Sequence, residues 1–297
     1  MTARDWFAMD RQKLALIPRG CLIRVKSLYH MLKTAERKAA DHLLDHPEGI
    51  SELSIVDYAA AAGCSEATIV RLSKKLGYQG FPELKADFGS NAGQENHYDY
   101  QGIRSTDEPP AVVDKVFEAN VQALKDTQGV LDMDQYRRAL EALLGASRIL
   151  FCGLGDAALV AMEAYQRFIR IGQSCMVSED PDVQLIQAAH LGKGDVVMAF
   201  SHSGRSLTVV NTVKQARAAG AVAIGVTNFP VSPLGKNADI VLQTAAFSTR
   251  VTGEVVSKRV TQLCIVESLY INYMIAKGKP ALRRLGASNQ AVRLYKL

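Results

Sequence analysis

A short polar segment, SHSGRS (201–206), stands between two apolar runs of the sequence. The run before it, DVVMAF, reads as a buried strand, and the run that begins at Leu207 reads as a helix. Serine hydroxyls and the backbone N–H groups around Gly204 would then lie beside the positive end of a helix dipole, which suits a phosphate. The same residue types also form ordinary hydrophilic turns, so a turn remains the alternative at this point.

A second group of polar residues follows the helical spacing of the segment EATIVRLSKKL (66–76). Ile69, Leu72 and Leu76 form the stripe that we expect to be buried. The side chains expected to face outward are those of Glu66, Thr68, Arg71, Lys74 and Lys75. Early residues of a recognition helix contact base edges, and later cations contact phosphates. We assign base or phosphate reading to Ser65, Glu66, Thr68 and Arg71, and phosphate contacts to Lys74 and Lys75. An ordinary solvated helix face is the alternative, because three cations on one helix are common.

The elements around that segment have the layout of a helix-turn-helix, LSIVDYAAAAGCSEATIVRLSKKLGY. Four successive alanines (59–62) allow another helix to pack closely, and Gly63 can take the left-handed conformation that ends a helix. Ser65 then stands where the N-cap of the next helix belongs.

The segment GSNAGQENHYDYQGIRSTDEPP has almost no aliphatic residues and is typical of a linker. After it, five apolar runs (RILFCG, QSCMVS, DVVMAFS, AVAIGVT and DIVLQT) alternate with helical segments. Strands that are apolar on both faces and separated by helices indicate a parallel sheet covered on both sides. We predict an α/β protein: an all-α helix-turn-helix domain (24–88), a linker (89–110), a doubly wound parallel-sheet domain (111–278) and a C-terminal tail (279–297).

Composition restricts the class of protein without deciding its function. The net charge of +5 fits anionic partners, but solubility alone would explain so mild an excess. The N-terminal residues mix charges into their apolar positions, and no apolar run reaches the roughly 20 residues that a bilayer requires. The five cysteines show no zinc-ligand spacing. We expect a cytoplasmic protein with no membrane partner, no metal and no cofactor.

Both halves of the chain resemble one known family. The segment LKTAERKAADHLLDHPEGI, followed by LSIVDYAAAAGCSEATIVRLSKKLGYQGFPELK, is similar to the N-terminal domain of the RpiR family of bacterial transcription regulators. The loops FCGLGDAALVAMEAYQRFIRIG, SHSGRS, NFPVSPLGKNADIVLQT and TGEVVSKRVTQLCIVESLY resemble a SIS domain, an isomerase-like fold that binds phosphosugars. The resemblance implies operator DNA and a sugar-phosphate effector as ligands. Two half-sites about 34 Å apart favour a homodimer, and a homotetramer is the alternative.

The resemblance also implies a set of ligand-binding residues. They are Gly153, Gly155, Ser201, Ser203, Gly204, Ser206, Glu254 and Lys258. The three serines would contact the phosphate, and the last two residues would lie near the sugar. Asp156 and Ala157 depart from the pattern, because the family commonly carries a serine in this first loop. A carboxylate there would weaken phosphate binding if it is close, or would accept hydrogen bonds from sugar hydroxyls or an amine.

We therefore predict a transcription regulator of the repressor type, without catalytic residues, whose operator binding a sugar phosphate modulates. Two alternatives remain at this point. The first is an NAD(H)-sensing regulator, because RILFCGLGDAALVAM contains a strand, a G-x-G-x-x-A turn and a helix, with Glu179 or Asp180 roughly 25 residues on. The second is a sugar-phosphate isomerase with a DNA-binding arm, for which His202 and Glu254 are the candidate acid and base.

Overall fold

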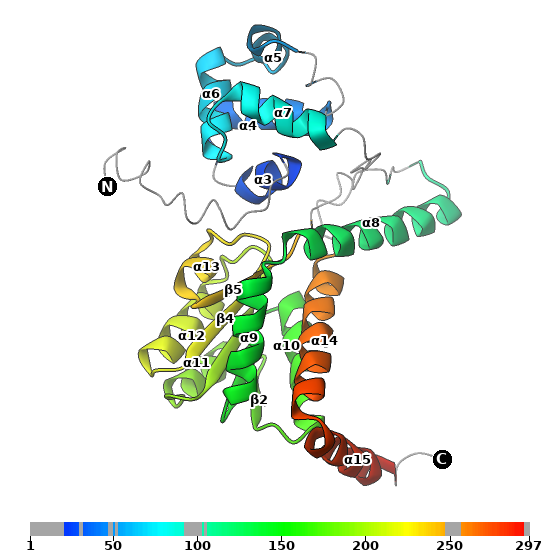
Figure 1. Cartoon of the computed structure of the whole chain (residues 1–297), viewed down its shortest axis with the longest axis vertical. Helices are drawn as coiled ribbons and strands as arrows, with labels where there is room; N and C mark the ends of the chain where they lie inside the picture. The colour runs from blue at the N-terminus through cyan, green and yellow to red at the C-terminus, as the bar shows by residue number, and fades with distance from the viewer. Residues whose placement is uncertain are drawn as a thin grey trace. The chain divides into compact units, whose positions relative to one another are not determined.

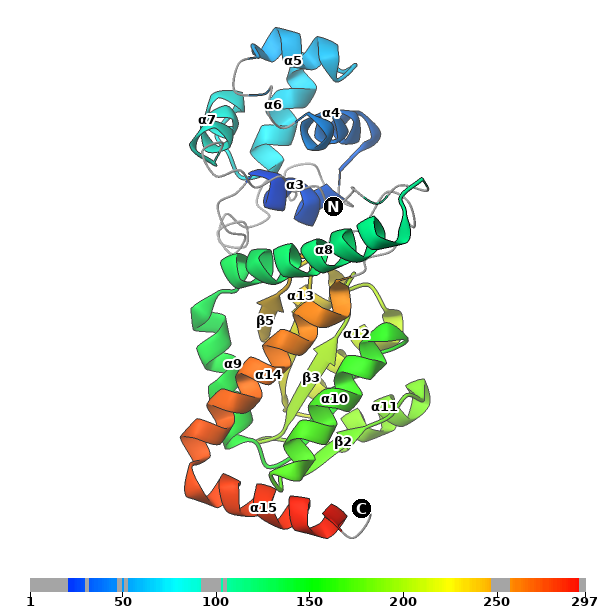
Figure 2. The same cartoon turned by 90° about the vertical axis from the view of Figure 1, so that its right-hand side faces the viewer.

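The computed structural model describes residues 21–29, 32–46, 50, 53–91, 103, 106–246 and 257–293. The chain forms two compact units, unit 1 (Met1–Asp99) and unit 2 (Tyr100–Leu297) (Figures 1 and 2). Each unit has a hydrophobic core of its own.

Unit 1 is helical throughout its described part. Its helices are α3 (Cys21–Leu28), α4 (Thr34–Asp45), α5 (Ile55–Ala61), α6 (Glu66–Lys75) and α7 (Phe81–Asn91). Helix α6 packs against α4, α5 and α7 and is therefore central to the unit. The buried ring of Tyr58 stacks on Phe81, with centroids 5.4 Å apart, and its hydroxyl donates a 2.6 Å hydrogen bond to the Ala39 carbonyl. The core thus satisfies its buried hydroxyl group.

The turn between α5 and α6 forms as the sequence predicts. Gly63 has φ +61°, in the left-handed region that favours glycine. The Cys64 N–H donates to the Ala59 carbonyl at 3.0 Å and closes the end of α5. Ser65 is the N-cap residue of α6, but its hydroxyl bonds the Thr68 hydroxyl at 2.9 Å and makes no cap hydrogen bond to the backbone.

Unit 2 contains a five-stranded parallel sheet. Its strands are β1 (Ile149–Cys152), β2 (Cys175–Val177), β3 (Val196–Phe200), β4 (Val222–Thr227) and β5 (Ile240–Gln243). Its helices are α8 (Pro109–Val130), α9 (Met133–Gly145), α10 (Asp156–Arg170), α11 (Pro181–Ala189), α12 (Leu207–Ala218), α13 (Pro233–Asn237), α14 (Lys258–Lys277) and α15 (Lys279–Arg293). The strands coincide with the five apolar runs, so the predicted fold class is confirmed.

Strands β1, β3 and β4 divide their buried side chains between two cores, one on each face of the sheet. In β1, Ile149 and Phe151 join a core with residues of α9, α10 and α14. Leu150 and Cys152 join a second core with residues of α11, α12 and α13. Figure 2 shows α10 and α14 crossing in front of the strands. Burial on both faces explains why these strands read as continuous apolar runs.

The strand order is β2-β1-β3-β4-β5, and it reverses between β1 and β3. Helix α10, which follows β1, and helix α12, which follows β3, accordingly cover opposite faces of the sheet. The loops after these two strands therefore diverge at the carboxyl edge of the sheet. Open α/β sheets bind ligands at such a point.

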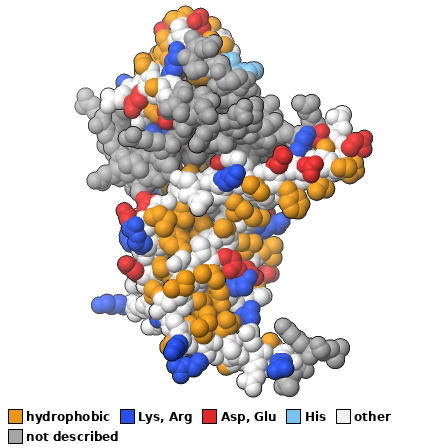
Figure 3. Space-filling model, turned by 45° about the vertical axis from the view of Figure 1, so that its right-hand side comes forward, with side chains coloured by type: hydrophobic (Ala, Val, Ile, Leu, Met, Phe, Trp, Pro, Cys, Tyr) orange, Lys and Arg blue, Asp and Glu red, His pale blue; other side chains and the backbone are white. Residues whose placement is uncertain are grey.

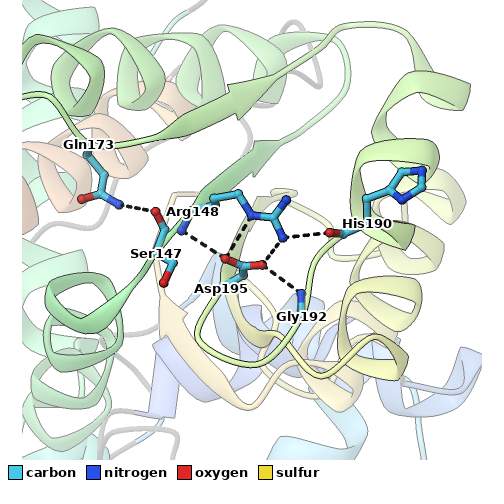
Figure 4. Close-up of polar contacts among 6 residues, drawn as sticks. All are labelled: Ser147, Arg148, Gln173, His190, Gly192 and Asp195. Atoms are coloured by element: carbon cyan, nitrogen blue, oxygen red, sulfur yellow. Dashed lines mark hydrogen bonds and ion pairs between the residues drawn. The ribbon is translucent and has the colours of Figure 1, made fainter.

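At the amino edge, an ion pair joins the same two strands (Figure 4). The Asp195 carboxylate lies 2.5 Å from the Arg148 guanidinium and accepts backbone N–H bonds from Arg148 at 3.1 Å and Gly192 at 2.9 Å. The guanidinium also donates to the His190 carbonyl at 2.8 Å. Burial raises the pKa of Asp195, but these hydrogen bonds outweigh burial and hold the pKa below its ordinary value. The ion pair therefore joins the starts of β1 and β3 at the amino edge of the sheet.

The segment expected to be a C-terminal tail contains helix α15. Gly278, at φ +57°, ends α14 and turns the chain. The Ser288 hydroxyl donates to the Arg170 carbonyl at 2.7 Å, and the Arg170 guanidinium donates to Asn289 at 2.7 Å, so α15 docks on α10. Sequence reasoning missed this helix because of its described side chains only Ala281 is buried.

Candidate functional sites

Helix α6 presents polar side chains outward over a buried apolar stripe. Ile69, Leu72 and Leu76 are buried, as the helical spacing predicts. The residues expected to read DNA are distributed unevenly: Ser65, Glu66, Arg71 and Lys74 are exposed, whereas Lys75 is half-buried and Thr68 is buried. The exposed members could approach a nucleic acid directly.

The expectation that Thr68 faces outward is wrong. Its side chain is buried because it stands one turn before Leu72 on the same side of the helix. Its hydroxyl bonds Ser65 at 2.9 Å and accepts a 3.0 Å hydrogen bond from the Arg71 guanidinium. Thr68 therefore orients Ser65 and Arg71, two of the exposed residues.

Lys75 forms an ion pair within unit 1. Its ammonium lies 2.5 Å from the carboxylate of Glu36, which is 4% exposed and also accepts the Lys33 N–H at 2.8 Å. Burial raises the pKa of Glu36, but these two hydrogen bonds outweigh burial and lower it below its ordinary value. Lys75 thus links α6 to α4, a contact that sequence spacing could not reveal because Glu36 is distant in the chain.

The SHSGRS loop follows β3 at the carboxyl edge of the sheet. Ser201 is buried, Ser203 is exposed, and Ser206 is the half-buried N-cap residue of α12. Gly204 has φ +63°, and a Cβ atom there would lie 1.9 Å from the Ser232 hydroxyl, so the position requires glycine. The loop is therefore closely fitted to the segment after β4.

His202 contributes a buried polar atom to this loop. Its Nδ1 has no hydrogen-bond partner among the described residues. Burial, together with a smaller contribution from the charge of Lys258, lowers the pKa of His202 from 6.5 to about 4. Its ring meets Phe229 edge to face at 5.8 Å. Lys258 therefore lies close enough to the SHSGRS loop to influence its imidazole, which is neutral at physiological pH.

Asn228, after β4, braces the loops beside SHSGRS. Its fully buried side chain donates to the Ala246 carbonyl at 2.6 Å and accepts hydrogen bonds from the Thr244 hydroxyl and the Ala246 N–H. The His202 carbonyl accepts the Asn228 N–H at 3.1 Å. These hydrogen bonds satisfy the polar groups of the buried Asn228 amide. They support the SHSGRS loop, although the Asn228 side chain is not itself exposed.

The loop after β1 carries Gly153 and Gly155. A Cβ atom at Gly153 would lie 2.5 Å from the Ala157 carbonyl oxygen, and Gly155, at φ +56°, is the N-cap residue of α10. Gln184, which sequence reasoning missed, is fully buried and donates to the Gly153 carbonyl at 2.9 Å. Gly153 therefore serves the close fit of this loop, whereas Gly155 serves its positive-φ backbone conformation, because a Cβ atom there would meet nothing within 4 Å.

Asp156, at the first position of α10, pairs with the start of α14. Its carboxylate lies 2.5 Å from the Lys258 ammonium and 3.0 Å from the Arg259 guanidinium. The hydrogen bond from Lys258, with the charge of Arg259, holds the pKa of Asp156 below its ordinary value. The structure thus brings the first loop to Lys258, whereas Glu254 lies outside the described residues.

Comparison with known proteins identifies the family. Two family profiles match the chain, "Helix-turn-helix domain, rpiR family" over residues 19–94 and "SIS domain" over residues 142–272. An uncharacterised HTH-type transcriptional regulator of Thermotoga maritima is 33% identical over 91% of this chain and 96% of its own length. The chain belongs to the RpiR family of transcriptional regulators.

Two further proteins are similar to this RpiR-family chain. The NanR protein of Vibrio vulnificus, solved in complex with ManNAc-6P, has the same fold, with a TM-score of 0.59 and 24% identity over 93% of this chain and 99% of its own. A bifunctional protein glk of Paraburkholderia xenovorans is 31% identical over 86% of this chain, which spans 40% of that protein's length. In the part of the RpiR-family chain that the structure describes, no helix is long and apolar enough to cross a membrane.

Proposed function

We propose that this RpiR-family chain is a repressor whose operator binding is modulated by a sugar phosphate held at the carboxyl edge of its sheet. The observation that carries the proposal is the meeting of three segments at the switch point. The SHSGRS loop, the first loop and the start of α14 are linked by the Asp156–Lys258 ion pair and by the charge of Lys258 on His202. The starts of α10, α12 and α14, together with Lys258 and Arg259, favour an anion.

The proposed ligand contacts are those of the resemblance, with two additions. Ser201, Ser203 and Ser206, with the backbone at Gly204, would hold the phosphate, and Gly153 and Gly155 would allow the first loop to approach the sugar. The Nδ1 of His202, which has no hydrogen-bond partner among the described residues, adds an acceptor. Arg259 adds a cation beside Lys258, and both would contact the same phosphate from the start of α14. Glu254 remains a proposed contact that lies outside the described residues. The ManNAc-6P bound to NanR is a phosphorylated sugar, which supports this ligand class.

For DNA, we propose that Ser65, Glu66 and Arg71 approach base edges or phosphates, and that Lys74 contacts a phosphate. Thr68 would act by holding Ser65 and Arg71 in place. Lys75 would reach a phosphate only in addition to its ion pair with Glu36.

We also propose that the protein works as a homodimer or homotetramer, because two half-sites multiply the weak discrimination of one recognition helix. Val113, Phe117 and Val121 are 50% or more exposed on α8 at four-residue spacing. Ile271 and Ile275, on the adjoining α14, are 51% and 73% exposed. Figure 3 shows hydrophobic side chains along α8 and over the body of unit 2. Contiguous apolar surface of this kind indicates an interface, and a second copy is the occupant that operator symmetry favours.

Self-association can be tested with Phe117→Glu, compared with Ile186→Glu on α11, on the other face of the sheet. Sedimentation equilibrium should give a smaller assembly for the first variant alone. An unchanged assembly in both would exclude this surface.

We propose that the protein is a cytoplasmic regulator without isomerase activity. A general base works best when its pKa lies near the operating pH, and the pKa of His202 is about 4. The NAD(H) alternative requires an acidic side chain near residue 180 that is available to bind the ribose hydroxyls. Asp180, one candidate ribose ligand, instead accepts the N–H groups of Asp182 and Val183 as the cap of α11.

The effector site can be tested by thermal unfolding with ManNAc-6P, other hexose 6-phosphates, the free sugars and NADH. A ligand at 100 times its dissociation constant stabilises by about 2.7 kcal/mol. Ser203→Ala with Ser206→Ala should abolish a shift seen with a sugar phosphate. Ser147→Ala with Ser174→Ala, at the amino edge of the sheet, is the matched control. A shift with NADH alone, or an unchanged shift in the first double variant, would contradict the proposal.

The DNA assignment is tested separately, by operator titrations over a range of salt. Arg71→Ala should weaken operator binding by about 1 to 3 kcal/mol and relax specificity at one base pair, whereas Lys74→Met should reduce the salt slope by about 1. Glu108→Gln, which removes a charge outside unit 1, is the control. If the two α6 variants change operator binding by small and equal amounts, α6 is an ordinary solvated helix and does not read DNA.

A further inference from the structure

Asp156 already holds the two cations at the start of α14. Its Oδ2 lies 2.5 Å from the Lys258 ammonium, and its Oδ1 accepts a 3.0 Å hydrogen bond from the Arg259 guanidinium. Each carboxylate oxygen therefore takes one cation, as two oxygens of a phosphate would. The Asp156 carboxylate therefore occupies the position beside Lys258 and Arg259 where a phosphate could bind.

This ion pair stands at the starts of two parallel helices. Asp156 and Lys258 meet at the first turns of α10 and α14, and further along the Phe168 ring lies 6.0 Å from Tyr270 and 5.2 Å from Tyr273. Both helix N-termini consequently face the same edge of the sheet, and their dipoles add to the attraction for an anion. A phosphate there would also lie near His202, whose pKa responds to Lys258.

The ion pair is exposed enough to exchange. The side chain of Asp156 is 43% exposed, that of Arg259 is 47% exposed, and that of Lys258 is 26% exposed. Exposed ion pairs contribute little to stability because water screens both partners, so that opening one costs little. A phosphate can carry up to two charges and more acceptor oxygens than a carboxylate, and can therefore replace it.

We infer that Asp156 is a built-in competitor of the effector's phosphate: it neutralises Lys258 and Arg259 in the free protein, and the incoming phosphate displaces it. The inference rests on the proposed sugar-phosphate site and names a residue that regulates it. Asp156 lowers the affinity of the site for anions. It thereby raises the effector concentration at which the regulator responds.

The test uses inorganic phosphate as the probe, titrated into the full chain and followed by ³¹P line width and by the thermal unfolding midpoint. Asp156→Asn removes the charge at constant shape, and Asp156→Ser repeats the test with a shorter side chain. Glu163→Gln is the matched control, because its carboxylate lies on the same helix and pairs with Arg167 at 2.7 Å. Lys258→Met, alone and combined with Asp156→Asn, tests whether the freed ammonium is responsible.

Loss of Asp156 should tighten phosphate binding roughly three- to tenfold, the range expected from one or two exposed ion pairs. Glu163→Gln should leave the affinity unchanged, and Lys258→Met should remove the gain. An unchanged affinity in both Asp156 variants would overturn the inference. Weaker binding in those variants would also overturn it, because Asp156 would then contact the ligand itself.

The two proposals can fail separately. If Lys258→Met weakens phosphate binding and the Asp156 variants do not change it, the anion site stands and the competition is wrong. If neither the wild-type chain nor the Asp156 variants bind phosphate, the inference is overturned. If the hexose 6-phosphates also leave the thermal unfolding midpoint unchanged, the proposed effector site is wrong as well.

Discussion

The two edges of the sheet in unit 2 hold the same chemical contact in different surroundings. At the amino edge, Asp195 pairs with Arg148, and its carboxylate is 4% exposed and accepts two backbone N–H groups (Figure 4). At the carboxyl edge, Asp156 pairs with Lys258 and Arg259, and its carboxylate is 43% exposed. Burial and backbone hydrogen bonds make the first contact structural, whereas exposure leaves the second replaceable.

Unit 1 contains a third case that resembles the amino edge. Glu36 is buried, accepts the Lys33 N–H and holds Lys75. A cation that a buried carboxylate holds in this way is less available to DNA than the exposed Lys74. The comparison therefore separates cations that stabilise the fold from cations that can serve a ligand.

The largest effect is expected from Asp195→Asn. The amide cannot accept hydrogen bonds from all the donors that surround Asp195, and the loss should be about 2 to 4 kcal/mol in the free energy of unfolding. Amide hydrogen exchange at Val196–Phe200 measures it within unit 2. Asp134→Asn, at an exposed ion pair, is the control and should cost less than about 0.5 kcal/mol. Equal losses in the two variants would break the distinction between buried and exposed pairs.

Glu36→Gln should destabilise unit 1 by about 1 to 3 kcal/mol, because it removes the charge that holds Lys75 and weakens the contact to Lys33. Amide hydrogen exchange at Ile69 and Leu72 measures this loss of stability. Glu66→Gln, at an exposed carboxylate, is the control. The folded-state pKa of Glu36 is lowered from 4.5. Its contribution is therefore present above that value and is lost as pH falls through the lowered pKa. Unchanged stability of Glu36→Gln would contradict a structural role for the ion pair between Glu36 and Lys75.

Asp156→Asn should change the free energy of unfolding by less than about 1 kcal/mol, since water screens both of its ion pairs. The same exchange measurement at β3 compares it directly with Asp195→Asn. A loss as large as that of Asp195→Asn would make Asp156 a structural residue, and its proposed displacement by phosphate would then be too costly.

The smallest effect concerns His202, whose pKa of about 4 lies below its ordinary value of 6.5. Between these values the unfolded chain is protonated and the folded chain is not, so stability falls as pH decreases, by about 0.7 kcal/mol from pH 7 to pH 6. NMR titration, with His202→Gln for assignment, gives the pKa directly. Bound phosphate should raise it, because a nearby anion favours the protonated form. A pKa near 6.5 would place the imidazole in water, away from the buried loop.

Much of the architecture follows from local patterns in the sequence. The helical spacing of 66–76, Gly63 and Ser65 predicted α6 and its turn, because caps and amphipathic stripes depend on neighbouring residues. The five apolar runs predicted the strands, and SHSGRS marked the loop after β3. Even so, Thr68 was expected to face outward, and the helix at 279–293 was missed, because those outcomes depend on what each segment packs against.

The sequence by itself determined the elements, their order and the loops that could bind an anion, since backbone propensity and hydrophobic periodicity are properties of neighbouring residues. Only the tertiary structure decided which charges meet. Asp156 and Lys258 are far apart in the chain, as are Glu36 and Lys75, and no local pattern links them. The strength of an ion pair depends on distance, burial and the hydrogen bonds around it, and the packing of helices on the sheet sets all three.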